Sequence, residues 1–174
     1  MKNQVVNLAC PFHPVKVSPG FYKKDLADFH LDIMGWCGYN CTYCSSPWGN
    51  YLRINRESFA DITEEQLGER TYPLTNPYLT FQYPDFVEKL DAQLGGVDKS
   101  FGEGRELVFS QLTDGFSPIA LGRGITRYAL DRIIESTSFT IRVMTKNAVV
   151  GTDPWIRYFL QNQERFIIGL SIGT

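Results

Sequence analysis

The sequence predicts an α/β fold in which about four parallel strands with covering helices form part of a (β/α) barrel. Three observations lead to this expectation. Segments with the alternation of strands recur along the chain, and segments with apolar residues at helical spacing lie between them. A regular succession of strand, helix and strand is typical of parallel sheets joined by right-handed crossovers. The chain has 174 residues, 43% of them hydrophobic, which suffices for a sizeable core.

The individual elements follow from local patterns. Phe29 to Met34 alternates apolar and polar residues, and the helix that opens at Pro84 is stopped by Gly95-Gly96. Asp153-Pro154 is typical of a helix start, with a capping residue followed by proline. We expect strands at 29–34, 107–109, 139–144 and 166–172, and helices at 84–94, 125–134 and 153–160.

Two regions lack this regular pattern. Residues 1–28 contain scattered prolines and predict an irregular lead-in with one short strand, whereas residues 29–174 form the core. Residues 45–82 are polar and aromatic. They predict a long loop with one short helix from Thr63, which has capping-box spacing to Gln66.

The last predicted strand is too apolar for an exposed sheet edge, since parallel strands are buried on both faces. The sequence reaches Thr174 two residues later. We therefore expect the chain to be the N-terminal portion of a larger barrel. The alternative is a complete small domain whose last strand is covered by the N-terminal thirty residues.

Composition narrows the class of protein. The formal net charge is only -2 and basic residues are scattered, so nothing supports nucleic acid as a partner. The sequence has no run of about 18 apolar residues that would suggest a membrane span. The apolar run at the N-terminus is too short for a secretory signal, so we expect a cytoplasmic protein. Four cysteines, three of them clustered, favour metal binding over disulfides in a chain of this size.

The clustered cysteines are Cys37, Cys41 and Cys44, spaced as C-x3-C-x2-C directly after the first predicted core strand. Their thiolates favour zinc, copper(I) or an iron-sulfur cluster. Structural zinc takes four protein ligands, and the fourth would have to be Cys10, His13 or His30. A four-iron cluster held by three cysteines keeps one iron open for chemistry, and the spacing favours this reading.

This loop resembles the signature of radical S-adenosylmethionine enzymes, a superfamily built on a (β/α) barrel. The resemblance implies that Cys37, Cys41 and Cys44 bind three irons of a 4Fe-4S cluster, and that the fourth iron chelates the methionyl group of S-adenosylmethionine. It implies reductive cleavage of this cofactor to a 5'-deoxyadenosyl radical, which abstracts hydrogen from a substrate. A flavodoxin- or ferredoxin-type protein would supply the electron.

Further segments resemble the spore photoproduct lyase branch and its uncharacterised relatives, namely residues 109–115, 125–127 and 144–147. The resemblance implies that Tyr43 approaches the adenine and Thr113 the methionyl part of the cofactor. It places Lys146 at the cofactor carboxylate and Ser171 near the ribose or carboxylate. Plain structural roles remain alternatives: packing beneath the loop for Tyr43, a turn for Thr113, a solvated loop position for Lys146 and a small barrel-lining position for Ser171.

The chain departs from that branch at informative positions. The lyases keep a cysteine as hydrogen donor two residues before the threonine or serine position, where this chain has Gln111. The family also often has glycine before the first cysteine and histidine two residues after it, where this chain has Trp36 and Tyr39. We therefore expect a radical S-adenosylmethionine enzyme of unknown substrate. A non-enzymatic zinc or iron-sulfur module and an inactive barrel fragment are the alternatives.

Overall fold

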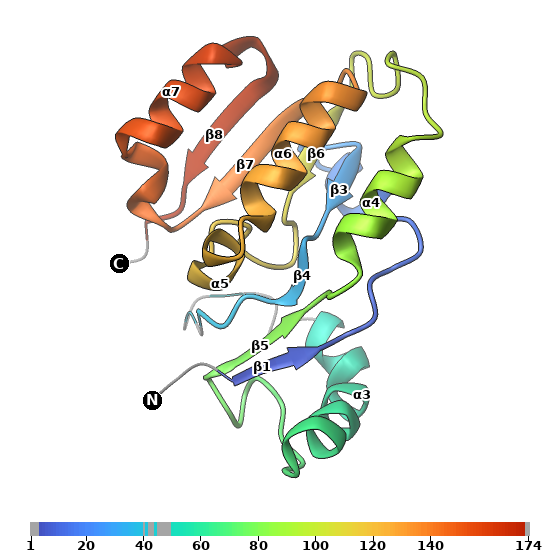
Figure 1. Ribbon diagram of the computed structural model, residues 1–174, viewed down its shortest axis with the longest axis vertical. Coiled ribbons are helices and arrows are strands. Elements are labelled where there is room, and N and C mark those ends of the chain that lie inside the picture. The colour runs from blue at the N-terminus through green and yellow to red at the C-terminus, as the bar shows by residue number, and fades with distance from the viewer. Residues whose placement is uncertain (1–3, 40, 42–43, 45–49, 173–174) are drawn as a thin grey trace.

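The computed structural model describes residues 4–39, 41, 44 and 50–172. Within these residues the protein is a mixed α/β structure with eight strands in two mixed sheets and six α-helices (Figure 1). The larger sheet has five strands and the smaller has three. The α/β class predicted from the sequence is confirmed.

The larger sheet contains the four parallel strands that the sequence predicts. Its order is β2-β3-β6-β7-β8, in which β3, β6, β7 and β8 run parallel and β2 is antiparallel to β3. The strands are β2 (Val15–Val17), β3 (Phe29–Leu31), β6 (Glu106–Phe109), β7 (Thr140–Thr145) and β8 (Phe166–Leu170). Within this sheet the strands therefore lie side by side in their order along the chain.

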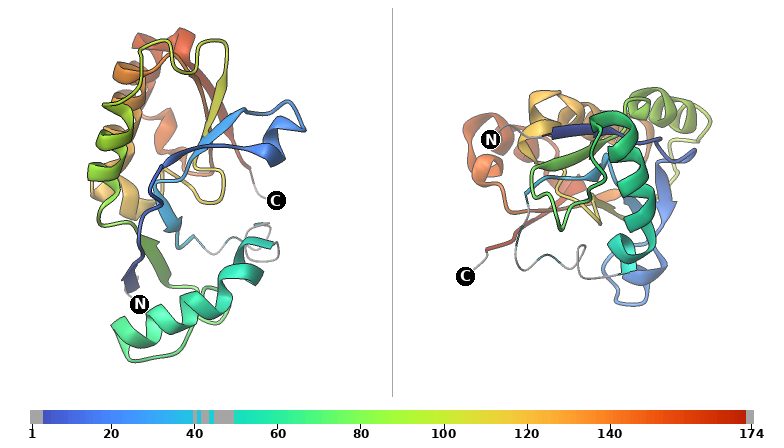
Figure 2. Two further views of the ribbon diagram at one scale, coloured as in Figure 1. Left: turned by 90° about the vertical axis from the view of Figure 1, so that its right-hand side faces the viewer. Right: turned by 90° about the horizontal axis from the view of Figure 1, so that it is seen from below.

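Helices cover one face of this sheet. They are α4 (Phe86–Leu94), α5 (Pro118–Gly122), α6 (Ile125–Ser136) and α7 (Asp153–Gln161), so the three predicted helices are confirmed. Figure 2 shows α4 and α6 along this face, with the lead-in on the other side. The core between helices and sheet is fully buried. The helices contribute Leu90, Leu130 and Ile133 to it, and the strands contribute Leu107 and Ile141. Burial of each such side chain contributes roughly 1.5–3 kcal/mol to folding.

The strand predicted at 29–34 is divided between the two sheets. β3 ends at Leu31, and β4 (Met34–Trp36) pairs antiparallel with β5 (Leu79–Gln82). β1 (Gln4–Asn7) pairs parallel with β5 and completes the smaller sheet. The division falls at Asp32, whose carboxylate accepts a hydrogen bond from the Leu112 amide instead of facing solvent beside a regular ladder.

The long loop predicted over 45–82 is wrong for its described part. Residues Asn50–Leu67 form the 18-residue helix α3, and β5 follows it. The helix packs on the smaller sheet, where the Phe59 and Phe81 rings stack with centroids 4.4 Å apart. Its apolar residues are few and widely spaced among charged ones, so the helical period is weak in the sequence.

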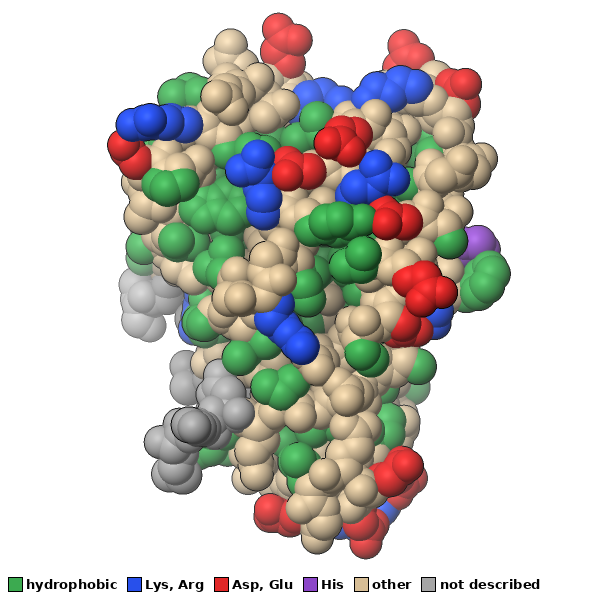
Figure 3. Space-filling view, in the orientation of Figure 1, with side chains coloured by type: hydrophobic (Ala, Val, Ile, Leu, Met, Phe, Trp, Pro, Cys, Tyr) green, Lys and Arg blue, Asp and Glu red, His purple; other side chains and the backbone are tan. Residues whose placement is uncertain are grey.

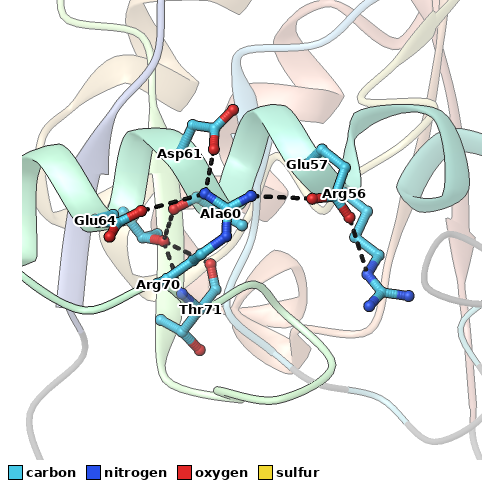
Figure 4. Close-up of polar contacts among 8 residues, drawn as sticks. Arg56, Glu57, Ala60, Asp61, Glu64, Arg70 and Thr71 are labelled. Carbon is cyan, nitrogen blue, oxygen red and sulfur yellow. Dashed lines mark hydrogen bonds and ion pairs between the residues drawn. The ribbon is translucent and has the colours of Figure 1, made fainter.

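Thr63 is not a helix cap. It lies buried within α3, and its hydroxyl oxygen is 2.5 Å from the Thr71 carbonyl oxygen and 3.1 Å from the Thr71 amide nitrogen. The turn that follows α3 is also tied back by Arg70, whose guanidinium reaches Glu57, Asp61 and Glu64 (Figure 4). These contacts fix the chain between α3 and the smaller sheet.

The lead-in is more regular than expected. It contains β1, β2 and the short helix α1 (Pro19–Tyr22), where the sequence predicts one short strand. The segment after α1 is joined to the larger sheet, because Arg142 Nε donates to the Leu26 carbonyl oxygen at 2.8 Å. The lead-in thus supplies part of the covering on the face opposite the helices (Figure 2).

β8 differs from the buried strand predicted from its composition. In the described part of the chain it pairs with β7 alone, and Ile167, Ile168 and Leu170 are 36%, 40% and 50% exposed.

Charges on the face drawn in Figure 3 are of both signs and interspersed, in keeping with the low net charge. Among the described helices, none combines the length and the apolar character needed to cross a bilayer.

Candidate functional site

The cysteine loop leaves the smaller sheet at the end of β4, where Cys37 directly follows Trp36. Gly38 then turns the chain with a left-handed φ of +70°. A side chain there would overlap the Thr80 hydroxyl and come within 3.2 Å of the Leu79 carbonyl oxygen. Glycine is therefore required for both the backbone conformation and the close approach to β5.

All three cysteines line one cavity of about 290 Å³, and the same cavity is lined by Thr113, Lys146 and Ser171. Thr113 follows β6, Lys146 follows β7 and Ser171 follows β8. The structure thus brings together every predicted site residue that it describes. Thr113, Lys146 and Ser171 lie at the carboxyl ends of parallel strands, where ligand sites of α/β folds collect, whereas the cysteines follow β4 of the smaller sheet. Tyr43 lies outside the described residues.

The donor set fits a thiolate-bound group in the chemical type of its side chains. None of the zinc-ligand candidates Cys10, His13 and His30 is among the described residues that line this cavity. The three thiols share its wall without closing around a metal position, since no group of three or more His, Cys, Asp or Glu side chains in the described chain is arranged to hold an ion. Burial raises the pKa of the Cys37 thiol to about 11, so the free thiol stays protonated near neutral pH.

Asp114 is a site residue that the sequence analysis missed. Its buried carboxylate accepts hydrogen bonds from the Thr145 hydroxyl at 2.7 Å and from the Lys146 amide at 3.0 Å. It also accepts from the Phe116 amide at 2.9 Å. One side chain thereby joins the loops after β6 and β7. The Thr-Asp-Gly sequence indicates only a turn, so the one available signal was an acidic residue beside a predicted ligand contact.

Tyr39 links the cysteine loop to Lys146. The Lys146 ammonium lies over the Tyr39 ring, 4.1 Å from its centroid, in a cation-π contact. The Tyr39 hydroxyl donates to the Phe116 carbonyl oxygen at 3.2 Å. Burial, followed by the charge of Asp114, raises the pKa of Tyr39 to about 12, so the phenol stays neutral and remains a donor.

Gln111 lines the cavity, and its amide oxygen accepts a hydrogen bond from the Ser18 hydroxyl at 2.6 Å. Two neighbouring hydroxyls, of Ser110 and Thr113, also belong to the wall. Both are buried and have no hydrogen-bond partner among the described residues. An unsatisfied buried hydroxyl typically costs about 1–3 kcal/mol, so a pair of them marks a place where a ligand or water completes the structure.

A larger cavity of about 600 Å³ lies at the opposite, amino-terminal ends of the strands, beside Phe29 and Phe101. Its main charged groups, Arg105 and Asp28, pair with each other at 2.9 Å. The smaller cavity is the stronger candidate, because it combines thiols, an ammonium and unpaired hydroxyls at the end of the sheet where loops converge.

Comparison with known proteins adds no relative: no family model, no curated protein and no solved structure matches the chain.

Proposed function

We propose that this chain is a radical S-adenosylmethionine protein that binds a 4Fe-4S cluster through Cys37, Cys41 and Cys44 and acts on an unknown substrate. The observation that carries the proposal is the shared cavity. Three thiols from a single loop and three residues from three successive parallel strands face the same 290 Å³ space. The sequential parallel order β3-β6-β7-β8 supports a partial barrel of the kind this superfamily uses.

The proposed roles of the residues follow from their chemistry. When bound, the cluster and S-adenosylmethionine supply reductive carbon-sulfur cleavage and hydrogen abstraction, with a flavodoxin- or ferredoxin-type protein as electron donor. Lys146, a compact cation, would bind the cofactor carboxylate. Thr113 has a hydroxyl without a described partner and would donate to the methionyl part, and Ser171 would lie near the ribose or carboxylate.

The residues around this set would orient it. Asp114 holds the Lys146 backbone and Tyr39 contacts its ammonium, so the cation is positioned from both loops. Gln111 has no thiol to donate a hydrogen atom, and its side chain is already engaged by Ser18. The proposed chemistry therefore excludes direct repair of the spore photoproduct by the known lyase route and leaves the substrate open.

Anaerobic reconstitution with iron and sulfide tests this proposal. We expect about four irons per chain and an electron paramagnetic resonance signal of the reduced cluster that changes when S-adenosylmethionine is added. Cys41→Ala should abolish the signal. Cys10→Ala is the matched control, because Cys10 is also buried but does not line the cavity. Its backbone amide and carbonyl are hydrogen-bonded to the side chains of Asp85 and Lys89.

Two outcomes would overturn the proposal. Stoichiometric zinc binding without a cofactor-sensitive cluster would identify a structural metal module. A chain that binds neither zinc nor an iron-sulfur cluster would be inactive in the proposed cluster chemistry.

A further inference from the structure

A buried carboxylate lies directly behind the wall of the candidate site. Asp32 sits where the chain passes from β3 to β4, and its Oδ1 accepts a hydrogen bond from the Leu112 amide at 2.8 Å. The adjacent amides of Gln111 and Thr113 also favour its ionised form. The amides of three consecutive residues thus act on one carboxylate, that of Leu112 through a hydrogen bond, and all three residues line the cavity.

The segment that these amides belong to begins in a strained conformation. Ser110 has a left-handed φ of +64°, which is unusual for a residue other than glycine. Its amide donates to the Leu31 carbonyl oxygen at 2.7 Å, one residue before Asp32. Such a conformation persists only where the surrounding structure fixes it, and the end of β3 supplies both the carbonyl and the carboxylate that do so.

Asp32 also lies between two cavities. The second one, about 140 Å³, is lined by Asp32 and by Leu112, which lines the candidate site as well. Titratable groups face it from every neighbouring element: Lys16 of β2, His30 of β3, Tyr51 of α3 and Tyr83 after β5. Among the described residues, the one at ion-pair distance from Asp32 is His30, with Nε2 3.9 Å from Oδ2.

The Asp32 side chain is only 11% exposed, so its charge is costly unless it is hydrogen-bonded, and the hydrogen bond that it accepts comes from a backbone amide of the cavity wall. Backbone amides that bind an ion usually form part of a ligand site, whereas these are directed away from the cavity to an internal side chain. The wall is therefore held from behind, and the hydroxyls of Ser110 and Thr113 remain without described partners.

We infer that Asp32 is a positioning residue for the ligand site, which holds residues 111–113 so that Thr113 and Gln111 keep their places in the cavity wall. The inference rests on the proposed function and extends it to a residue that touches neither the cluster nor the cofactor. Ionised Asp32 anchors the wall, and a neutral side chain of the same shape anchors it less well, because charge-assisted hydrogen bonds are roughly twice as strong as neutral ones.

The test compares Asp32→Asn with Asp28→Asn. Asp28 is the matched control, because its carboxylate accepts the Glu106 amide at 2.9 Å at the opposite end of the same strand. In Asp32→Asn we expect faster amide hydrogen exchange at residues 111–113, resolved by NMR in the metal-free protein. In the reconstituted protein, we expect S-adenosylmethionine to perturb the cluster signal at concentrations about tenfold higher than in wild type. Asp28→Asn should match wild type in both measurements.

The outcomes separate the inference from the function. A wild-type cluster that does not respond to S-adenosylmethionine removes the proposed function and this role with it. A wild-type response that Asp32→Asn reproduces at the same concentration overturns the positioning role alone. If Asp32→Asn does not fold, wild-type exchange decides: amides 111–113 that exchange as fast as the exposed turn residues 103–104 would show that Asp32 does not hold them. Asp32→Glu is the second variant if Asp32→Asn does not fold. Because it keeps the charge, it should retain part of the response of the cluster signal to S-adenosylmethionine.

Discussion

Replacing Asp32 with asparagine should change how the free energy of unfolding depends on pH. Burial is the main cause that raises the pKa of Asp32 from 3.8 to about 6 in the folded protein, against the opposing effect of the Leu112 amide. The folded state therefore binds a proton more tightly than the unfolded state. Stability from this group is fully present below pH 3.8 and is lost as the pH rises through about 6.

The expected magnitude follows from these two pKa values. Each pKa unit corresponds to about 1.4 kcal/mol, so the whole change is about 3 kcal/mol. About half of it, roughly 1.4 kcal/mol, falls between pH 5 and pH 7.5. Asp32→Asn does not titrate, so the difference in unfolding free energy, wild type minus variant, should fall by this amount over that range.

Urea unfolding of the metal-free protein, followed by circular dichroism in the presence of a reductant, measures this difference. His30 lies beside Asp32, and burial lowers its pKa from the usual histidine range. The comparison is therefore repeated in a His30→Gln background, where the same trend should persist. A difference that stays constant within about 0.5 kcal/mol, or that rises with pH, would refute the assignment of a buried, raised pKa to Asp32.

Three further experiments have clear expected outcomes. Gly38→Ala should destabilise the fold by about 2 kcal/mol or more in urea unfolding. Gly104→Ala is the control, because Gly104 has a similar φ of +66° but no atoms near the added side chain, and it should cost about 1 kcal/mol. Equal costs would contradict the close contact of Gly38 with β5. Thr63→Val should lower the free energy of unfolding by about 1–3 kcal/mol, because it removes buried hydrogen bonds. Arg70→Ala removes only exposed ion pairs and should lower it by less than about 1 kcal/mol. A larger loss of thermal stability in Arg70→Ala than in Thr63→Val would contradict this order. Lys146→Gln should weaken the response of the reconstituted cluster to S-adenosylmethionine about tenfold while leaving the cluster signal itself intact, and an unchanged titration would remove Lys146 from the site.

The sequence predicts the larger sheet well because its parallel strands and helices carry strong periodic signals. Phe86, Leu90 and Leu94 share a helical face, and Leu107 to Phe109 form a short apolar run between turn residues. The smaller sheet was not predicted, because β1 and β5 have four residues each and are joined only by long-range pairing. Such pairing leaves no local pattern in the sequence.

The candidate site divides in the same way. The cysteines could be found from their spacing after a strand, and Thr113 and Lys146 from the resemblance to the lyase branch. Asp114 and Asp32 could not, because their roles depend on amides that the fold brings to them from other segments. An aspartate beside a strand reads as a turn or a solvated charge unless its partners are known.

Because one predicted strand is divided between two sheets, the candidate site is built on both of them. The cysteine loop follows β4 and contacts β5 of the smaller sheet, whereas Lys146 and Ser171 follow β7 and β8 of the larger sheet. Substitutions in the small core around Trp36, Phe59 and Phe81 should therefore act first on the half that carries the thiols. Their effect reaches the other half through the chain at residues 32–33 and through the contact between Tyr39 and Lys146.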